Sequence, residues 1–221
     1  MNVIILGSTG MVGKGVLLEC LEDSDIKNIL VLSRQTCNIN HDKLREIIHE
    51  DFFDFSEIKE QLKGFDACFF CLGVSAAGLD EKKYSKITYD LTLGFAQIML
   101  EQNPNSVFCY ISGAGTDSSE KGKIMWARVK GKTENALLAL PFKESYMFRP
   151  GYIQPLKGVK SKTRAYNVFY SIFKPFYFIL KSFKGLATDS VTLGKVMIYV
   201  AMNGYDKRII SSKDIYMLSQ K

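Results

Sequence analysis

A glycine-rich turn near the start of the chain has the composition of a phosphate-binding loop. Its three glycines recur every third residue, between an apolar β-branched run and a stretch with helical periodicity. Gly7 permits a tight turn, Gly10 lets the backbone approach a pyrophosphate, and Gly13 lets the helix pack against the strand. Free N–H groups and the positive end of the helix dipole favour an anion there, with hydroxyl groups of the loop as further donors. The alternative is an ordinary strand-to-helix turn. The predicted contacts are Gly7, Ser8, Thr9, Gly10, Met11, Val12 and Gly13.

The end of the second apolar run, residues 29–32, indicates which dinucleotide the loop would hold. This run is followed by Ser33 and Arg34. A carboxylate here would accept hydrogen bonds from the adenosine ribose and repel a 2′-phosphate, whereas arginine can grip that phosphate with its planar fork. Arg34 therefore predicts NADP(H) in preference to NAD(H). The alternative is an ordinary exposed arginine at a strand end.

Two further strand ends are expected beside the same dinucleotide. Asp54 could meet the adenine amino group, or it could equally cap the helix that follows it. Residues 67–72 are almost continuously apolar, as in a central parallel strand. Because open α/β sheets bind ligands outside the carboxyl ends of their strands, Cys71, Leu72 and Gly73 are predicted to lie beside the pyrophosphate or the nicotinamide ribose.

Strand and helix patterns alternate along the chain, which indicates an α/β fold with a parallel sheet. At 221 residues the chain can bury a core as one domain, and no linker-like composition divides it, so a single domain over 1–221 is predicted. The predicted strands cover 3–6, 29–32, 46–49, 67–72, 107–111, 146–148 and 208–210, and the later helices cover 57–62, 84–102, 123–140 and 191–201.

The cysteines, the histidines and the lack of long apolar runs limit the kinds of site and location that are expected. The five cysteines are odd in number, and three lie in apolar strand candidates, so they are expected to be buried thiols. Cys68 and Cys71 would point to opposite faces of a strand, which argues against a shared metal or a disulfide. His41 and His49 have no neighbouring ligand grouping, so no metal is predicted. The chain shows no targeting segment and no run long enough to span a bilayer, which predicts a cytoplasmic location.

Charge is distributed unevenly along the chain. Residues 1–120 carry 10 Lys and Arg against 18 Asp and Glu, whereas residues 121–221 carry 19 against 5. The simplest interpretation is that the basic half surrounds an anionic ligand; the alternatives are an acidic partner, a membrane surface or a nucleic acid. No nucleic-acid-binding motif is present, so no nucleic-acid partner is expected.

The segment 155–185 is basic, aromatic and free of acidic residues. Its few polar side chains fall near one narrow helical stripe, which predicts two largely apolar helices that form a cap over the substrate side. The alternatives are a homodimer face and a shallow contact with a membrane surface.

Taken together, these landmarks resemble the extended and atypical members of the short-chain dehydrogenase/reductase superfamily. Within it they resemble the Tat-interacting-protein-like, NAD(P)H-binding branch that is often labelled epimerase-like. The resemblance implies a Rossmann-type doubly wound parallel sheet with a C-terminal helical cap. The matching segments span most of the chain and are 5–10, 32–34, 54–55, 71–73, 111–117, 129–134 and 148–151.

In that superfamily a serine, a tyrosine and a lysine carry out the chemistry. The tyrosine gives or takes the proton as hydride moves, the lysine lowers its pKa and holds the nicotinamide ribose, and the serine orients the carbonyl. The resemblance assigns Ser112 and Lys130 to two of these roles. Pro150 and Gly151 would shape the turn at the end of the strand 146–148, which leaves Arg149 and Tyr152 as candidates for the wall of the site, and Arg149 is predicted to bind the cofactor. Trp126 stands where the tyrosine is expected, four residues before Lys130. Indole can donate a hydrogen bond but cannot cycle a proton near neutral pH.

Two functions follow from this departure. In the first, the protein is an NADP(H)-dependent reductase or epimerase-like enzyme acting on an unknown small molecule, and its proton comes from Tyr84, Tyr89, Tyr152 or water. In the second, it binds NADP(H) without turnover as a regulatory or redox-sensing protein, with Trp126 on the nicotinamide.

Overall fold

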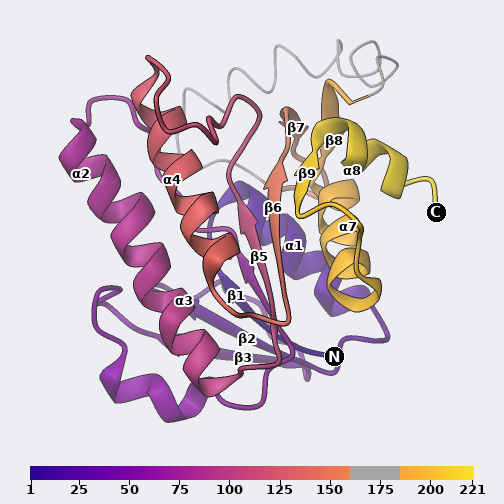
Figure 1. The fold of residues 1–221 in the computed structure, drawn as a ribbon. Helices are drawn as coiled ribbons and strands as arrows, with labels where there is room; N and C mark the ends of the chain where they lie inside the picture. Colours follow the sequence, from indigo (N-terminus) through magenta and orange to yellow (C-terminus); the bar gives the residue numbers. More distant parts are fainter. Residues whose placement is uncertain (160–184) are drawn as a thin grey trace.

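The computed structural model describes residues 1–159 and 185–221 (Figure 1). The helical cap predicted over 155–185 lies outside these residues except at its two ends. The described elements are, in chain order, β1 (Asn2–Leu6), α1 (Met11–Glu22), β2 (Asn28–Ser33), β3 (Leu44–Ile48), η1 (Ser56–Leu62), β4 (Ala67–Phe70), α2 (Glu81–Ser85), η2 (Lys86–Asp90), α3 (Leu91–Gln102), β5 (Val107–Ile111), α4 (Met125–Ala139), β6 (Glu144–Arg149), β7 (Tyr152–Gln154), β8 (Ala187–Asp189), α7 (Ser190–Asn203), β9 (Ile209–Ser211) and α8 (Ser212–Leu218).

The main sheet confirms the predicted α/β fold. Within the described residues it has seven strands in the order β3-β2-β1-β4-β5-β6-β9, and every pair is parallel. The chain moves from β1 to one edge through β2 and β3, then returns to the other side of β1 at β4. This reversal is the topological switch point, where the loops after β1 and β4 diverge and leave a crevice.

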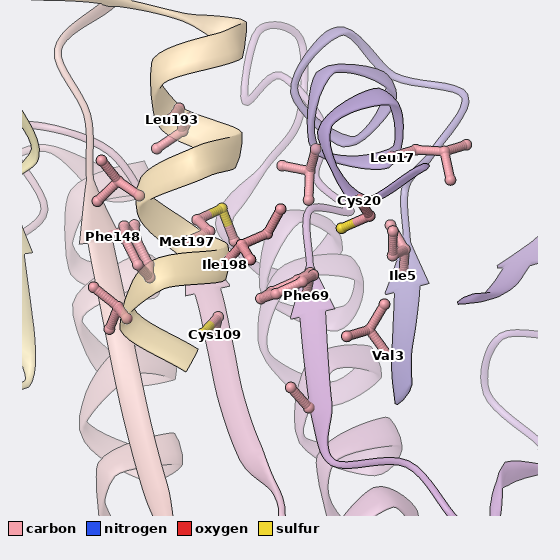
Figure 2. Close-up of a cluster of buried hydrophobic side chains, with 14 of the residues drawn as sticks. Val3, Ile5, Leu17, Cys20, Phe69, Cys109, Phe148, Leu193, Met197 and Ile198 are labelled. Atoms are coloured by element: carbon pink, nitrogen blue, oxygen red, sulfur yellow. The ribbon is translucent and has the colours of Figure 1, made fainter. Parts of the chain in front are cut away.

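One face of the sheet packs against α1 and α7, while α2, α3 and α4 lie on the opposite side (Figure 1). Because successive side chains of a strand point to opposite faces, alternate residues of β1, β4, β5 and β6 meet these two helices. Figure 2 shows this cluster, which includes Val3, Ile5, Phe69, Cys109 and Phe148 from the strands and Leu17, Cys20, Leu193, Met197 and Ile198 from the helices.

The intervening strand residues form a second core that is richer in aromatic rings. Phe70 of β4 stacks on Phe108 of β5, with ring centroids 5.9 Å apart, and also meets Phe95 of α3. Cys68 belongs to this core, whereas Cys71 packs against the other one, as the period-two alternation requires. All five cysteines are free thiols.

Short elements differ from the sequence predictions. The helix predicted over 57–62 is the 3₁₀ helix η1, and the one predicted over 84–102 contains the π-helical turn η2 between α2 and α3. The pair of β7 and β8 was not predicted, because each strand has three residues and its partner is distant in the sequence. Helix α8 is also short, and it begins at a capping box between Ser211 and Asp214. Among the described residues, no helix combines the length and apolar character needed to cross a membrane.

Candidate functional site

A cleft of about 500 Å³ opens at the switch point, outside the carboxyl ends of β1, β2 and β4. Its size is within the usual range for ligand-binding sites. The wall comes from the three strand ends and from one aromatic side chain. The lining residues are Gly7, Thr9, Gly10, Leu32, Ser33, Arg34, Gln35, Phe52, Cys71, Leu72, Gly73 and Val74.

The glycine-rich turn leaves no space for side chains at two of its three glycines. Gly7 has φ +82°, and a Cβ on it would lie 2.6 Å from the backbone carbonyl carbon of Cys71. A Cβ on Gly13 would lie 2.3 Å from the carbonyl oxygen of Gly7. Helix α1 therefore starts directly against the turn, and Gly10 at its N-cap makes no side-chain capping bond. The first N–H groups of α1 lack helical partners and can bind an anion, so this cradle fits the pyrophosphate of a dinucleotide.

The predicted loop residues divide between the cleft and the interior. Thr9 lines the cleft beside two of the glycines. Ser8 is fully buried and is not among the lining residues, and its hydroxyl has no hydrogen-bond partner among the described residues. Met11 and Val12 lie in the first turn of α1 and are half-buried, outside the lining set.

At the end of β2, the guanidinium of Arg34 is exposed and makes no ion pair within the described part of the chain. Asp54 is not a lining residue: its carboxylate accepts a hydrogen bond of 2.9 Å from the N–H of Ser56, which lowers the pKa of the carboxyl group. The N-cap of η1 is Phe55, and no side chain caps this helix, so Asp54 is not the cap that the alternative predicted and instead closes a local turn with Ser56. Phe52 lines the cleft instead. Sequence reasoning missed Phe52, although an apolar ring just after the third strand was the available signal.

Beyond the cleft, Ser112 follows β5 and is buried. Its hydroxyl lies between two acceptors, the carboxylate of Glu134 and the carbonyl of Phe148. Lys130, on α4, donates a hydrogen bond from Nζ to the carbonyl oxygen of Ser112. Burial lowers the pKa of the Lys130 amine to about 8, against the opposing effect of Glu134. The structure thus places Ser112, Lys130 and Glu134 next to one another.

Glu134 and Arg149 form a buried ion pair behind Ser112. The Glu134 side chain is 0% exposed, that of Arg149 is 18% exposed, and Nε of Arg149 lies 3.0 and 3.1 Å from the two carboxylate oxygens. Arg149 also donates to the hydroxyl of Ser118 over 2.5 Å. Arg149 is therefore held by the interior of the protein and does not line the cleft. Sequence reasoning missed Glu134, although it stands four residues after Lys130 and so shares its helical face.

Trp126 is half-buried in the first turn of α4, one turn before Lys130. Its ring packs against the turn after β5, where a Cβ on Gly115 would lie 3.3 Å from the indole. The indole therefore covers the loop that follows Ser112. Trp126, Lys130 and Glu134 are spaced by four residues and form one stripe on α4.

The three tyrosines that were considered as other proton donors all have partners. Tyr84 is buried and its hydroxyl bonds to the side chain of Thr88, while burial raises its pKa. Tyr89 lies under the ammonium of Lys132, 4.3 Å from the ring centroid. Tyr152 donates to the side-chain oxygen of Gln154 over 2.7 Å.

Two curated relatives illustrate what the chain is similar to. "Protein FMP52, mitochondrial" from Saccharomyces cerevisiae is 28% identical over 237 aligned positions, which cover 99% of this chain and 96% of the relative. "Protein HTATIP2" from Rattus norvegicus is 25% identical over 154 positions, which cover 69% of this chain and 62% of the relative. These relatives confirm the branch that the sequence motifs indicated.

A solved structure supports the fold. Gre2 from Candida albicans, solved in complex with NADPH, matches with a TM-score of 0.71 and 15% identity over 96% of this chain and 78% of that one. At this identity the match establishes the Rossmann-like fold alone.

The predicted cytoplasmic location is wrong on these comparisons. The FMP52 relatives from several fungi, including one that matches 99% of this chain, are named as mitochondrial proteins. The prediction had rested on the lack of a recognisable targeting segment, and the folded core that the strands and helices encode does not determine the compartment in which a protein works.

The family follows from the N-terminal part of the chain, where the cradle and the switch point lie. The family model that matches covers residues 3–125, which is more than half of the chain and includes β1 through β5. On this match, the chain belongs to the NAD dependent epimerase/dehydratase family.

Proposed function

We propose that this protein binds NADP(H) in the switch-point cleft and uses it to reduce a small carbonyl compound. The observation that carries the cofactor preference is the composition of the cleft wall. Within the described part of the chain, Arg34 at the end of β2 forms no ion pair, and no Asp or Glu is among the residues that line the cleft. A 2′-phosphate would therefore meet a free guanidinium and no opposing carboxylate.

Residues of the chain are available to contact each part of the dinucleotide. The pyrophosphate would be held over the N-terminus of α1 by the backbone of the glycine-rich turn. Arg34 would bind the 2′-phosphate, and Phe52 would pack against the adenine ring. The loop after β4, with Leu72 and Gly73, would border the ribose on the nicotinamide side. When bound, NADPH supplies the hydride, and the loop after β5 is next to this end of the cleft because β5 pairs with β4.

Arg34→Ala is expected to weaken NADPH binding about 10- to 100-fold, because a charge-assisted hydrogen bond contributes about 1.5–3 kcal/mol. NADH binding should stay within about twofold of the parent, since NADH lacks the 2′-phosphate. Quenching of the single tryptophan or calorimetry would give both dissociation constants.

Arg45→Ala is the matched control for this experiment. Arg45 is an exposed arginine on β3 that bonds to Gln61 and does not line the cleft. It should leave both affinities unchanged. If Arg34→Ala binds NADPH as tightly as Arg45→Ala does, the preference for NADP(H) does not come from Arg34.

A second function, NADP(H) binding without turnover, is favoured by the surroundings of Ser112. Its hydroxyl lies against interior acceptors, and the residue one turn before Lys130 is Trp126, whose indole cannot exchange a proton. A protein of this kind would report the redox state of the NADP(H) pool to a partner.

Trp126→Tyr separates the two functions. In a reductase that already turns over, the new phenol adds a second proton donor, and kcat for NADPH-dependent reduction of an aromatic aldehyde should rise severalfold or more. General acid catalysis of this type contributes about 10²- to 10⁴-fold. Trp126→Phe is the control for loss of the indole. A parent chain that binds NADPH but shows no turnover, together with an active Trp126→Tyr, would replace the reductase proposal by the silent-binder one.

A further inference from the structure

Three side chains with donor hydrogens gather at the end of β5, and two of them cannot protonate a substrate. The hydroxyl of Ser112 has one hydrogen. The two groups beside it, the carboxylate of Glu134 and the carbonyl of Phe148, are both acceptors, so this hydrogen is donated to the protein and not to a substrate. The indole N–H of Trp126 donates hydrogen bonds but is far too weak an acid to release its proton near neutral pH.

Lys130 differs from both because its ammonium group has three hydrogens. One of them is donated to the carbonyl oxygen of Ser112. Within the described residues Lys130 forms no ion pair, since the nearest carboxylate on its helical face, Glu134, is bound by Arg149. Two N–H groups of Lys130 therefore have no assigned partner within the described part of the chain.

The register of the sheet brings this amine close to the cleft. Phe70 of β4 pairs with Tyr110 of β5, so the loop after β4, which lines the cleft, is next to the loop that begins at Ser112. Lys130 bonds to the backbone of Ser112 itself. Its Nζ is thus one strand away from the wall where the nicotinamide end of a dinucleotide would lie.

We propose that Lys130 is the proton donor of the reduction in this chain, in place of the tyrosine that position 126 lacks. The inference rests on the proposed reductase function. In the step, hydride adds to the carbonyl carbon of the substrate, and the π electron pair of the C=O bond moves to its oxygen. That oxygen takes a proton from Nζ of Lys130, which becomes a neutral amine. Water then returns a proton to the amine, so the ammonium form is restored for the next turnover.

The surroundings of Lys130 suit this role. An ordinary lysine is too weak an acid to release a proton readily at neutral pH, but burial brings the pKa of Lys130 to about 8. Glu134 opposes this shift, and Arg149 from β6 offsets the charge of Glu134. On α2 and η2, which pack against α4, Glu81 pairs with Arg128, Tyr84 bonds to Thr88, and Tyr89 lies under Lys132. The other ionisable side chains of α2, η2 and α3 are exposed: Lys82, Lys83, Lys86, Asp90 and Glu101.

The test compares the parent chain with Lys130→Met and Lys130→Arg, using NADPH with 4-nitrobenzaldehyde and 9,10-phenanthrenequinone as probe carbonyl compounds. Because the ammonium form is the donor, kcat/KM for reduction should be level below about pH 7 and fall as the pH rises through 8. Lys130→Met should lower kcat by at least about 100-fold. In Lys130→Arg the guanidinium keeps its positive charge but cannot release its proton near neutral pH. This variant should therefore bind NADPH within about threefold of the parent and lose activity as Lys130→Met does.

A second readout does not depend on turnover. Reductive methylation with ¹³C-formaldehyde labels the lysines, and the resonance absent from Lys130→Arg identifies Lys130 in the NMR spectrum. That resonance should titrate near pH 8.

The outcomes separate the two proposals. If the parent chain fails to bind NADPH or to reduce either probe, the proposed function is contradicted, and the role of Lys130 with it. If the parent reduces the probes and Lys130→Met does so at a similar rate with an unchanged pH profile, only the role of Lys130 is overturned. Titration of Lys130 above pH 10 in an active parent would also overturn it.

Discussion

Gly13→Ala is expected to abolish measurable NADPH binding and to lower the free energy of unfolding by about 3 kcal/mol, as overpacking of a tight contact does. A Cβ at this position would lie 2.3 Å from the carbonyl oxygen of Gly7 and 2.5 Å from its carbonyl carbon. Both atoms belong to backbone, so the clash is relieved only by moving α1 away from the turn. That movement would also displace the N–H groups that the pyrophosphate needs. Urea unfolding followed by circular dichroism and NADPH calorimetry would measure the two effects.

Gly10→Ala is the matched control, because it adds the same methyl group three residues earlier in the loop. The nearest atom to a Cβ there is the carbonyl oxygen of Gly7, at 3.2 Å, and Gly10 lines the cleft. This variant should fold with a loss of about 1 kcal/mol or less and should still bind NADPH more weakly than the parent, because the methyl group intrudes where the cofactor approaches. If Gly13→Ala unfolds at the same urea concentration as the parent, the close contact between α1 and the turn has no energetic importance.

The parts of the molecule that could be predicted from the sequence are those with local signals. The strands next to the cleft are apolar runs that end at glycine or at a polar pair, and a parallel sheet brings such ends to one edge. For this reason Gly7, Gly10, Arg34 and Leu72, far apart in the sequence, lie together around the cleft. The glycine spacing also indicated how closely α1 approaches the turn.

The remaining features depend on contacts between distant elements. The position of Glu134 on α4 was visible in the sequence, but its burial and its pairing with Arg149 arise only when β5, β6 and α4 pack together. Asp54 presents a related difficulty: a carboxylate after a strand fits both a ligand contact and a helix cap. In the structure Asp54 neither lines the cleft nor caps η1, because it accepts its hydrogen bond from Ser56 in a local turn. The hydrophobic periodicity of the sequence indicates neither the pairing of Glu134 with Arg149 nor the role of Asp54.

Three side chains on one stripe of α4 hold the loop that follows β5. Trp126 covers the loop after β5, and Lys130 donates a hydrogen bond to the backbone carbonyl of Ser112. Glu134 accepts a hydrogen bond from the Ser112 hydroxyl and pairs with Arg149. All three side chains therefore act on the same loop, from the half-buried Trp126 to the fully buried Glu134. The ion pair at the inner end therefore supports the geometry of Ser112 and Lys130, and its loss should affect the whole chain and not only the site.

Arg149→Leu is expected to destabilise the chain by about 3–5 kcal/mol, because it leaves a buried carboxylate without its partner. The Glu134 side chain is 0% exposed, so water cannot replace the guanidinium without opening the core. The double variant Glu134→Leu, Arg149→Leu should recover most of this loss, since a buried ion pair replaced by apolar groups of similar volume is often close to neutral in stability. Urea unfolding of the two single variants and the double variant completes the cycle and yields the coupling energy.

Arg208→Leu provides the matched control, because Arg208 also pairs with a glutamate on the sheet. Its contact with Glu144 is 2.7 Å long, but the two side chains are 49% and 33% exposed. Such a surface pair contributes about 0–1 kcal/mol, and Arg208→Leu should cost no more than that. If Arg149→Leu is as mild as Arg208→Leu, or if the double variant is as unstable as the sum of the single ones, the buried pair does not stabilise the loop that holds Ser112. In that event the alignment of Ser112 with Lys130 would have to come from the backbone contacts of α4 alone.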